Sequence, residues 1–505
     1  MLALEVGLIC EATGATQLCG DPNTVAKQPS IDSRTVTPEG LFVAFQGERV
    51  DGNNYAGRAI EAGAACVVVT RTPEEALVQQ ANAAGCALVR AQDDDGQEFL
   101  LRLAAAWRKK HPQWCVLGVT GSVGKTTTKD MLAAACSAAY VTHATKGNFN
   151  NLIGLPLTLL TTPDDAQVVV AEMGMNHPGE IHRLSEVARP CCALITNIGT
   201  SHIGLLGSRE NIARAKAEIV DGMDQASLEG MQLEPSLHLW AVDDFSDFIA
   251  TNFAQKAGIA VTFVGGHDIA IDSTKAAGFK LAVDASDVTT ASAQLHASNV
   301  QVNPEGFVSC EVCYPDGMHI PATLPIPGKH LLSDFLLALS VADSLGINRQ
   351  ASIEAIQQMP QTHMRLELVG GGDKPRMIDD SYNASPTSMA AALDVLCSLH
   401  CEGRRIAVLG EMGEMGSQAA RLHDLVGAYA AAKPLDMLVL IGATYVEGMR
   451  QVALVMGFSD DKIEIFKTVD EALHAIKPIL TKDDVVLAKA SRSSALDLFV
   501  KGVLE

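Results

Sequence analysis

The sequence has no long hydrophobic run, and none of its apolar stretches approaches the roughly 18 to 20 residues that a membrane-spanning helix needs. Its N-terminus also lacks the basic segment and apolar core that mark a secretory signal peptide. We therefore expect no membrane insertion and a cytoplasmic location.

Basic residues are scarce as well. The chain has 38 Lys and Arg against 59 Asp and Glu, which gives a formal net charge of −21. So acidic a chain is repelled by phosphate backbones, which disfavours nucleic acid or an anionic membrane as its main partner. Anionic small molecules stay compatible with this charge, because a single loop can bind them locally.

Cysteines at the spacing of metal ligands are nearly absent, although the chain has 12 cysteines. Cys310 and Cys313 form one C-x-x-C pair, and Cys191 and Cys192 are adjacent. Neither has the second pair that a zinc site would need, so we interpret them as reduced, buried thiols. Internal repeats and low-complexity segments are also absent.

The length of 505 residues and the hydrophobic content of 48% are enough for about three domains with sizeable cores. Proline-containing segments at 109–112 and 324–330 indicate two hinges. We predict an N-terminal domain over 1–111, a central domain over 112–326 and a C-terminal domain over 327–505. Apolar strands alternate with helical stretches, which predicts an α/β fold with a doubly wound central sheet and a Rossmann-like C-terminal sheet.

The most informative stretch is Cys115–Ala139, where an apolar strand, a glycine loop and an alanine-rich helix follow one another. Glycines let backbone N–H groups converge on an anion, and the helix N-terminus adds its positive dipole end. We expect Lys125 to reach the terminal phosphates of ATP and the Thr126 hydroxyl to hold Mg²⁺. The predicted nucleotide loop comprises Thr120, Gly121, Ser122, Val123, Gly124, Lys125, Thr126 and Thr127.

The spacing of this loop is shorter than in G-x-x-x-x-G-K-[ST], where the first glycine would fall at Val119. A plain glycine turn between a strand and a helix is therefore the alternative. We favour a nucleoside triphosphate site, because the strand, the lysine, the hydroxyl and the helix all stand in the right order.

Polar residues follow the next strands of the predicted sheet. Glu172 ends the strand over 167–171, and His202 follows the strand over 192–198. Ligands bind beyond the carboxyl ends of strands in doubly wound sheets, so we predict that both side chains ligate Mg²⁺. Asparagines 148, 150 and 151 lie in a polar loop, for which a turn and binding of polar substrate groups are both open.

The predicted helix over 210–220 presents Lys216, which ordinarily would be a solvated surface lysine. In the C-terminal domain, Ser385 and Pro386 predict a helix N-cap and first turn. Asp380 and Asn383 precede that cap, on a loop where a nucleotide could be held. Between residues 221 and 321 we find no motif, only strand-like alternation over 301–314.

Several short motifs are specific in combination. Beyond T-G-S-V-G-K-T-T they read G-N-F-N-N-L-I-G-L-P, A-E-M-G-M-N, N-I-G-T-S-H, A-K-A-E, P-G-K-H, M-R-L-E, D-D-S-Y-N-A-S-P, G-E-M-G-E-M-G and K-A-S-R. With them the chain resembles the Mur ligases of peptidoglycan synthesis over nearly its whole length, most weakly between residues 221 and 320. The D-S-Y-N-A and G-E-M-G-E-M-G segments favour a member that joins D-alanyl-D-alanine to UDP-N-acetylmuramoyl-tripeptide, and the D-N-P-R signature of the diaminopimelate-adding ligase is absent.

The resemblance implies an ATP-dependent ligase with a UDP-sugar domain, a central ATP domain and a mobile C-terminal cover. It implies catalysis by Lys125, Glu172, His202 and Lys216, the last carrying CO₂ as a carbamate, with Thr126 completing the Mg²⁺ ligands. A monomer is expected. The implied ATP contacts beyond the loop are Asp334, Arg365, Asp380, Tyr382 and Asn383. The implied substrate contacts are Ser33, Arg34, Gln46 and Gly47 at the uridine end, Asn148, Asn150 and Asn151 along the muramoyl-peptide path, and Lys489, Ser491 and Arg492 for the incoming dipeptide.

Two positions depart from the family pattern. Asp334 stands where the family carries an asparagine that reads adenine, and Ala490 replaces the glycine of K-G-S-R. Two rival functions remain. A folylpolyglutamate-type ligase has no use for the first 110 or so residues, and a nucleotide-dependent switch leaves Glu172 and His202 without a task.

Overall fold

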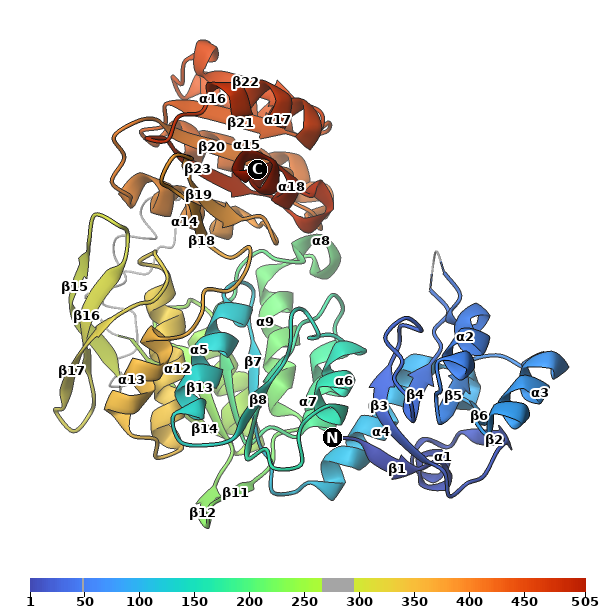
Figure 1. Cartoon of the computed structure of the whole chain (residues 1–505). Coiled ribbons are helices and arrows are strands. Elements are labelled where there is room, and N and C mark those ends of the chain that lie inside the picture. The colour runs from blue at the N-terminus through green and yellow to red at the C-terminus, as the bar shows by residue number, and fades with distance from the viewer. Residues whose placement is uncertain (48–49, 266–294) are drawn as a thin grey trace. The chain divides into compact units, whose positions relative to one another are not determined.

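The computed structural model describes residues 1–47, 50–265 and 295–505. Figure 1 shows the whole chain coloured by residue number. The chain divides into two compact units. Unit 1 comprises residues 1–119, 140–193 and 218–236, and unit 2 comprises residues 120–139, 194–217 and 237–505. Glu48 and Arg49, within the Q-G-E-R sequence, lie outside the described residues, as do residues 266–294 of the predicted central domain. The predicted domain boundaries stay a prediction.

Unit 1 begins with a six-stranded sheet of order β1-β3-β4-β5-β6-β2. Its four middle strands are parallel, and the two edge strands are antiparallel to their neighbours. The strands are β1 (Ala3–Glu5), β2 (Thr16–Cys19), β3 (Val25–Ser30), β4 (Gly40–Val43), β5 (Cys66–Val69) and β6 (Ala87–Arg90). The helices are α1 (Val6–Thr13), α2 (Ala56–Glu61), α3 (Glu75–Ala84) and α4 (Gly96–Lys110).

Two features of this first sheet follow from its sequence. Every residue of β4 and β5 is buried, as expected for apolar strands at the centre of a sheet covered by helices. Helix α4 ends at Lys110, two residues before Pro112, because a proline disfavours helical geometry in the residue before it. The helix thus ends within the proline-containing segment 109–112, and the hinge predicted there stays a prediction.

Unit 1 also contains the parallel strands on which the candidate site is built. Strands β7 (Cys115–Thr120) and β8 (Thr142–Ala144) both pair parallel with β9 (Val168–Glu172). The full sheet has the order β14-β13-β10-β7-β9-β8, and both β7 and β10 (Cys192–Ile195) begin in unit 1 and end in unit 2. All residues of β7 and β9 are buried, so the predicted buried parallel strands are confirmed. Helices α6 (Gly154–Leu160) and α7 (Glu180–Ala188) complete this part.

Unit 2 contains the helix that follows the glycine loop, α5 (Lys125–Ser137), against which α12 (Leu331–Ser344) and α13 (Arg349–Gln357) pack. The short helix α8 (Ile203–Leu206) and helix α9 (Arg209–Ala217) follow β10. The unit further contains β13 (Ser236–Trp240) after its first residue, α10 (Ser246–Ile249), β14 (Ala260–Val264) and the antiparallel strands β15 (His296–Val302), β16 (Val308–Cys313) and β17 (His319–Thr323). The sheet predicted over 301–314 from alternation is thus present.

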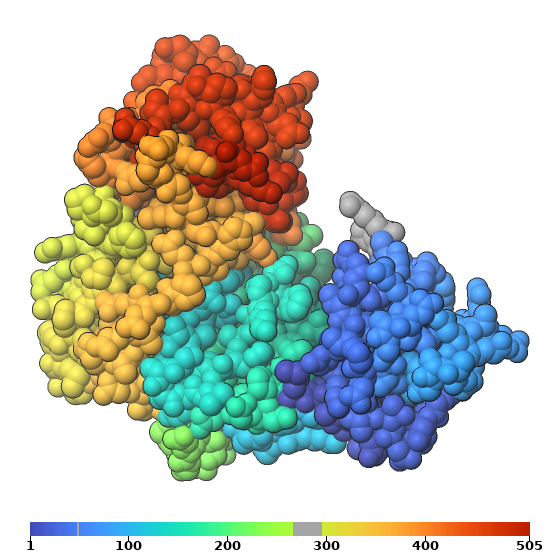
Figure 2. Space-filling model, viewed as in Figure 1, coloured from blue at the N-terminus to red at the C-terminus, as the bar shows by residue number. Residues whose placement is uncertain are grey.

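The C-terminal part of unit 2 is a second α/β sheet of order β18-β19-β23-β20-β21-β22, parallel except for β18. In Figure 1 the helices of this part, drawn in orange to red, lie around its sheet, and Figure 2 shows the same part in the same colours as a space-filling view. Its strands are β18 (Glu367–Gly370), β19 (Arg376–Asp380), β20 (Arg405–Gly410), β21 (Met437–Ile441), β22 (Ile463–Phe466) and β23 (Val485–Lys489). Its helices are α14 (Pro386–Ser398), α15 (Ala419–Ala431), α16 (Val446–Val455), α17 (Val469–Ile476) and α18 (Asp497–Leu504).

Helix α14 begins as its sequence predicts. Ser385 is the N-cap, and its side chain and that of Ser388 form a capping box, with Pro386 in the first turn. Among the described residues, no helix combines the length and the apolar character needed to cross a membrane.

Candidate active site

The phosphate-type loop has the predicted layout of strand, glycine loop and helix. Strand β7 ends at Thr120 and α5 begins at Lys125. Gly124 has φ +85°, a left-handed conformation that favours glycine, and a Cβ there would lie 2.5 Å from Asp334 Oδ2. A Cβ on Gly121 would collide with Thr196 Oγ1. Both glycines are therefore required by the fold of this loop.

Residues after β10 hold the loop in shape. Ser122 N donates to the carbonyl oxygen of Asn197 at 2.9 Å, and Gly199 N donates to Ser122 Oγ at 2.8 Å. Thr196 Oγ1 donates to the carbonyl oxygen of Val123 at 2.6 Å. This bracing preorganises the loop for a ligand, which lowers the entropy that binding must otherwise remove.

Two lysine ammonium groups meet at one backbone oxygen of the loop. Lys125 Nζ donates to the carbonyl oxygen of Gly121 at 2.9 Å, and Lys216 Nζ donates to the same oxygen at 2.8 Å. Two positive charges sharing one neutral acceptor repel each other, so this position favours an anion. Phosphate oxygens are the anions that such loops bind.

Lys216 is buried, with 1% of its surface exposed, so its alternative description as a solvated helix lysine is wrong. Burial, reinforced by the charge of Lys125, lowers the pKa of Lys216 well below its ordinary value. Glu218 is not its hydrogen-bond partner, because the Glu218 carboxylate accepts hydrogen bonds from Gly179 N and His182 N. Sequence position alone could not reveal this burial.

His202 directly precedes α8 and has φ +63°, an uncommon conformation for a residue with a side chain. Its Nδ1 lies 2.7 Å from Oε2 of Glu414, in the loop after β20. Among the described residues His202 Nδ1 has no partner that meets the geometry of a hydrogen bond, so this contact is a close approach rather than an aligned bond.

Glu172 is the last residue of β9 in unit 1, and it is 1% exposed. Its Oε1 accepts a hydrogen bond from Asn150 Nδ2 at 2.7 Å, and its backbone N–H donates to Thr145 Oγ1 at 3.0 Å. A buried carboxylate oriented by an amide is the type of oxygen ligand that Mg²⁺ prefers. Thr126, in unit 2, adds a hydroxyl of the same hard-oxygen class.

The asparagine loop shows one of its two predicted roles, that of a turn. Asn151 Oδ1 accepts hydrogen bonds from Ile153 N and Gly154 N, at the start of α6, which is a turn and capping role. Asn150 holds Glu172, whereas Asn148 is exposed. The predicted contacts with substrate stay a prediction.

The predicted nucleotide and dipeptide residues of the C-terminal part are interconnected. Lys489, only 2% exposed, donates to Asp380 Oδ2 at 2.6 Å and to the carbonyl oxygen of Asn383 at 3.0 Å. The guanidinium of Arg365 lies 4.4 Å from the ring centroid of Tyr382. Two further predicted residues have partners of their own: Ser491 Oγ accepts from Gly413 N, and Arg492 pairs with Asp497.

The predicted uridine-end residues lie in unit 1. Ser33 is buried, and Arg34 is largely exposed while its guanidinium pairs with Asp32. Gln46 and Gly47 are exposed, and an isolated antiparallel bridge pairs Gln46 with Asp51. Their binding role stays a prediction.

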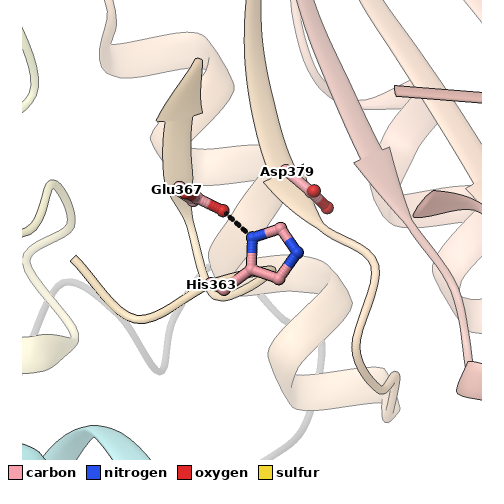
Figure 3. A group of neighbouring side chains, drawn as sticks. All are labelled: His363, Glu367 and Asp379. Atoms are coloured by element: carbon pink, nitrogen blue, oxygen red, sulfur yellow. Dashed lines mark hydrogen bonds and ion pairs between the residues drawn. The ribbon is translucent and has the colours of Figure 1, made fainter. Parts of the chain in front are cut away.

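One cluster that the sequence reasoning missed lies at the start of the C-terminal sheet. His363, Glu367 and Asp379 offer ligand atoms within 4.8 Å of one another (Figure 3). Glu367 Oε2 accepts from His363 Nδ1 at 2.7 Å and from Met364 N at 3.0 Å, and Asp379 Oδ1 accepts from Ser381 Oγ at 2.6 Å. These internal bonds account for the cluster as a brace for the loop that carries Arg365.

Comparison with known proteins shows to which family this chain belongs. The Mur ligase middle domain model matches residues 119–342, the Mur ligase glutamate ligase domain model matches residues 364–492, and the Mur ligase family catalytic domain model matches residues 28–108. UDP-N-acetylmuramoyl-tripeptide–D-alanyl-D-alanine ligase of Bacillus subtilis (strain 168) is 33% identical over 489 residues, which cover 95% of this chain and 94% of the relative. The chain belongs to the Mur ligase family.

Further similarities extend over the whole of this Mur ligase. The enzyme of the same name from Synechocystis sp. is 32% identical over 94% of this chain and 91% of the relative. The crystal structure of MurF from Acinetobacter baumannii matches with a TM-score of 0.81 and 27% identity, covering 99% of both chains. The predicted family and the α/β fold class are therefore confirmed. The family models place His202 and Glu414 in two different matched segments of unit 2.

Proposed function

We propose that this Mur ligase joins D-alanyl-D-alanine to UDP-N-acetylmuramoyl-tripeptide at the expense of ATP, in the synthesis of peptidoglycan precursors. The full-length relatives carry that activity in their names. The observation that carries the proposal is the braced phosphate loop, in which the ammonium group of Lys125, at the start of α5, lies on the carbonyl oxygen of Gly121. Such an arrangement is suited to a triphosphate and to the charge that develops as a phosphoryl group moves.

The chemistry requires activation of the acid before the amide bond can form. The substrate carboxylate attacks the γ-phosphorus of ATP, and ADP leaves, so that an acyl phosphate forms. The amine of the dipeptide then attacks the acyl carbon, and phosphate leaves from the tetrahedral intermediate with loss of a proton from nitrogen. Lys125 neutralises charge on the moving phosphoryl group, and the braced backbone N–H groups of the loop orient the phosphates.

The candidate metal ligands fit Mg²⁺ by their donor types. Glu172 in unit 1 contributes a buried carboxylate, and Thr126 in unit 2 contributes a hydroxyl. His202 and Lys216, also in unit 2, are proposed as further Mg²⁺ ligands, and Lys216 is proposed to act as a carbamate. When bound, Mg²⁺ supplies positive charge that offsets the charge of the triphosphate.

The remaining predicted roles are part of this proposal. Residues 1–111, 112–326 and 327–505 are proposed as the UDP-sugar, ATP and covering domains of a cytoplasmic monomer. The residues proposed to contact ATP outside the phosphate loop are Asp334, Arg365, Asp380, Tyr382 and Asn383. The residues proposed to contact the substrates are Ser33, Arg34, Gln46, Gly47, Asn148, Asn150, Asn151, Lys489, Ser491 and Arg492.

The experiment that tests the function is the release of ADP by purified protein. We expect release only when UDP-N-acetylmuramoyl-tripeptide, D-alanyl-D-alanine, ATP and Mg²⁺ are all present, because the acyl phosphate forms on one substrate and is consumed by the other. Activity with a folate and glutamate instead would favour the folylpolyglutamate-type alternative. ADP release without either substrate would favour a nucleotide switch.

Asp334 gives a prediction for the affinity of ATP. It is 3% exposed, it packs on Gly124, and Thr128 donates to its carboxyl group. Asparagine can both donate to and accept from adenine, whereas ionised aspartate can only accept. We expect Asp334→Asn to lower the KM for ATP about 2- to 10-fold, the equivalent of one hydrogen bond.

The pH dependence adds a sharper readout for Asp334. Burial raises the pKa of this carboxyl group well above its ordinary value, so it loses its proton as the pH rises through that raised value. The ratio of the KM of the wild type to that of Asp334→Asn should therefore grow with pH. Asp373→Asn, at an exposed aspartate, is the control. An Asp334→Asn variant with an unchanged or higher KM would show that the side chain does not contact the base or is compensated.

A further inference from the structure

The loop after β20 contacts the segment that carries His202. Besides the 2.7 Å contact between His202 Nδ1 and Glu414 Oε2, Gly204 N donates to the carbonyl oxygen of Glu414 at 3.3 Å. Both parts belong to unit 2, yet they lie in segments matched by two separate family models. Glu414 thus reaches from the C-terminal sheet to a candidate metal ligand next to the phosphate loop.

The backbones approach so closely that only glycine fits. A Cβ on Gly204 would stand 2.8 Å from the carbonyl oxygen of Glu414, and a Cβ on Gly416 would stand 2.6 Å from Gly204 Cα. The turn at Gly416–Gln418 therefore packs closely and specifically on α8, and this is not a loose surface contact.

Both residues of the pair, His202 and Glu414, have an uncommon backbone conformation. His202 and Glu414 each have φ +63°, and neither is a glycine. Such conformations are energetically unfavourable and persist where the surroundings enforce them, often at functional sites. The contacts between α8 and the loop after β20 therefore have to offset this backbone strain.

The chemistry of the pair fits the same arrangement, because the carboxylate of Glu414 lies 2.7 Å from the imidazole of His202. Ring nitrogens of metal-binding histidines are commonly oriented by a carboxylate on the other nitrogen.

We propose that Glu414 is a positioning residue for His202, supplied by the C-terminal segment: its carboxylate fixes the imidazole through Nδ1 and leaves Nε2 directed to the ligand site. The inference rests on the proposed function and adds a residue to it. It implies that the imidazole is held in its working orientation only while the loop of residues 410–416 is seated on α8.

A double-mutant cycle tests this idea. We expect Glu414→Gln to lower kcat about 10- to 100-fold, as for other residues that orient a metal ligand, with the KM for ATP within about 2-fold of wild type. In a His202→Ala background, Glu414→Gln should have less than about 2-fold further effect, because the group through which it acts is gone. Losses that multiply in the double variant would overturn the proposal.

A matched control and a measurement without turnover complete the test. Glu402→Gln removes another glutamate that lies beside a histidine, His400, on the surface, and should leave activity unchanged. Hydrogen exchange of residues 203–206 and calorimetric affinity for ADP with Mg²⁺ should match wild type in Glu414→Gln, since the Gly204 bond goes to backbone. Faster exchange in that variant would show a structural role and contradict positioning. If the wild type itself releases no ADP with the proposed substrates, the function fails, whereas multiplying losses in an active enzyme refute only the role of Glu414.

Discussion

Replacing Lys125 with alanine should reduce ligation to less than about one hundredth of the wild-type rate. Loss of one charged or hydrogen-bonding group that acts on the transition state typically costs a factor of 10² to 10³. Lys125 is the loop cation that faces Gly121 and is placed at the start of α5, where phosphate oxygens bind. The measurement is steady-state ADP release at saturating substrates.

The stability of this variant has to be checked separately. Lys125 Nζ also donates to carbonyl oxygens of its own loop, so alanine removes contacts worth about 0.5–1.5 kcal/mol each. A loss of that size lowers the melting temperature by only a few degrees and leaves the protein folded. Lys27→Ala, which removes an exposed lysine paired with Glu39, is the control. Near-normal turnover of folded Lys125→Ala would show that this loop does not hold the reacting phosphates.

Local features of the fold were predictable because their causes are local. The order of strand β7, glycine loop and α5 follows from an apolar run, from glycines and from a helix-forming stretch that are adjacent in the sequence. The cap of α14 follows from Ser385 and Pro386, and the end of α4 follows from Pro112. In each case the residues that determine the geometry lie within a few positions of it.

Contacts between distant segments could not be predicted in this way. Lys216 sits on a helix whose sequence fits a solvated face, yet its ammonium lies 2.8 Å from Gly121 O, 95 positions away. Lys489 was expected at the dipeptide, and the structure pairs it with Asp380, 109 positions away. Such pairs depend on how sheets and loops assemble, which the composition and spacing of a segment do not encode.

The region between residues 221 and 321 shows a third case. The alternation over 301–314 predicted strands, and β15 and β16 are present there. The sequence offered no chemistry for this region because alternating apolar residues describe a surface that packs, not a site. The His363, Glu367 and Asp379 cluster was missed for a related reason: its members lie on a loop and on two strands, so they share no spacing that a motif could reveal.

Lys216 provides the second large expected effect. A cation beside Lys125 and a divalent metal ion would be repelled. Among the described residues the ammonium group of Lys216 has no acidic partner and donates to a carbonyl oxygen. Reaction of the neutral amine with CO₂ forms a nitrogen–carbon bond and releases a proton, so the side chain becomes an anion with two oxygen atoms. Hard Mg²⁺ prefers such oxygens. The burial of Lys216 supports this modification, because a buried ammonium group loses its proton more readily than an exposed one.

Chemical rescue distinguishes a carbamate from a simple lysine. Lys216→Ala should lose most of its activity, on the order of 10²-fold or more, because the anion that would hold Mg²⁺ is gone and the metal ion no longer offsets charge at the reacting phosphates. High concentrations of a short carboxylate such as acetate should restore part of it, since acetate fits the space of the missing side chain and supplies the same two oxygens. The same acetate should not rescue Lys125→Ala, where a cation is missing, and this contrast is the control. Full activity of Lys216→Ala, or an inactive variant that no small acid restores, would count against a carbamate at this position.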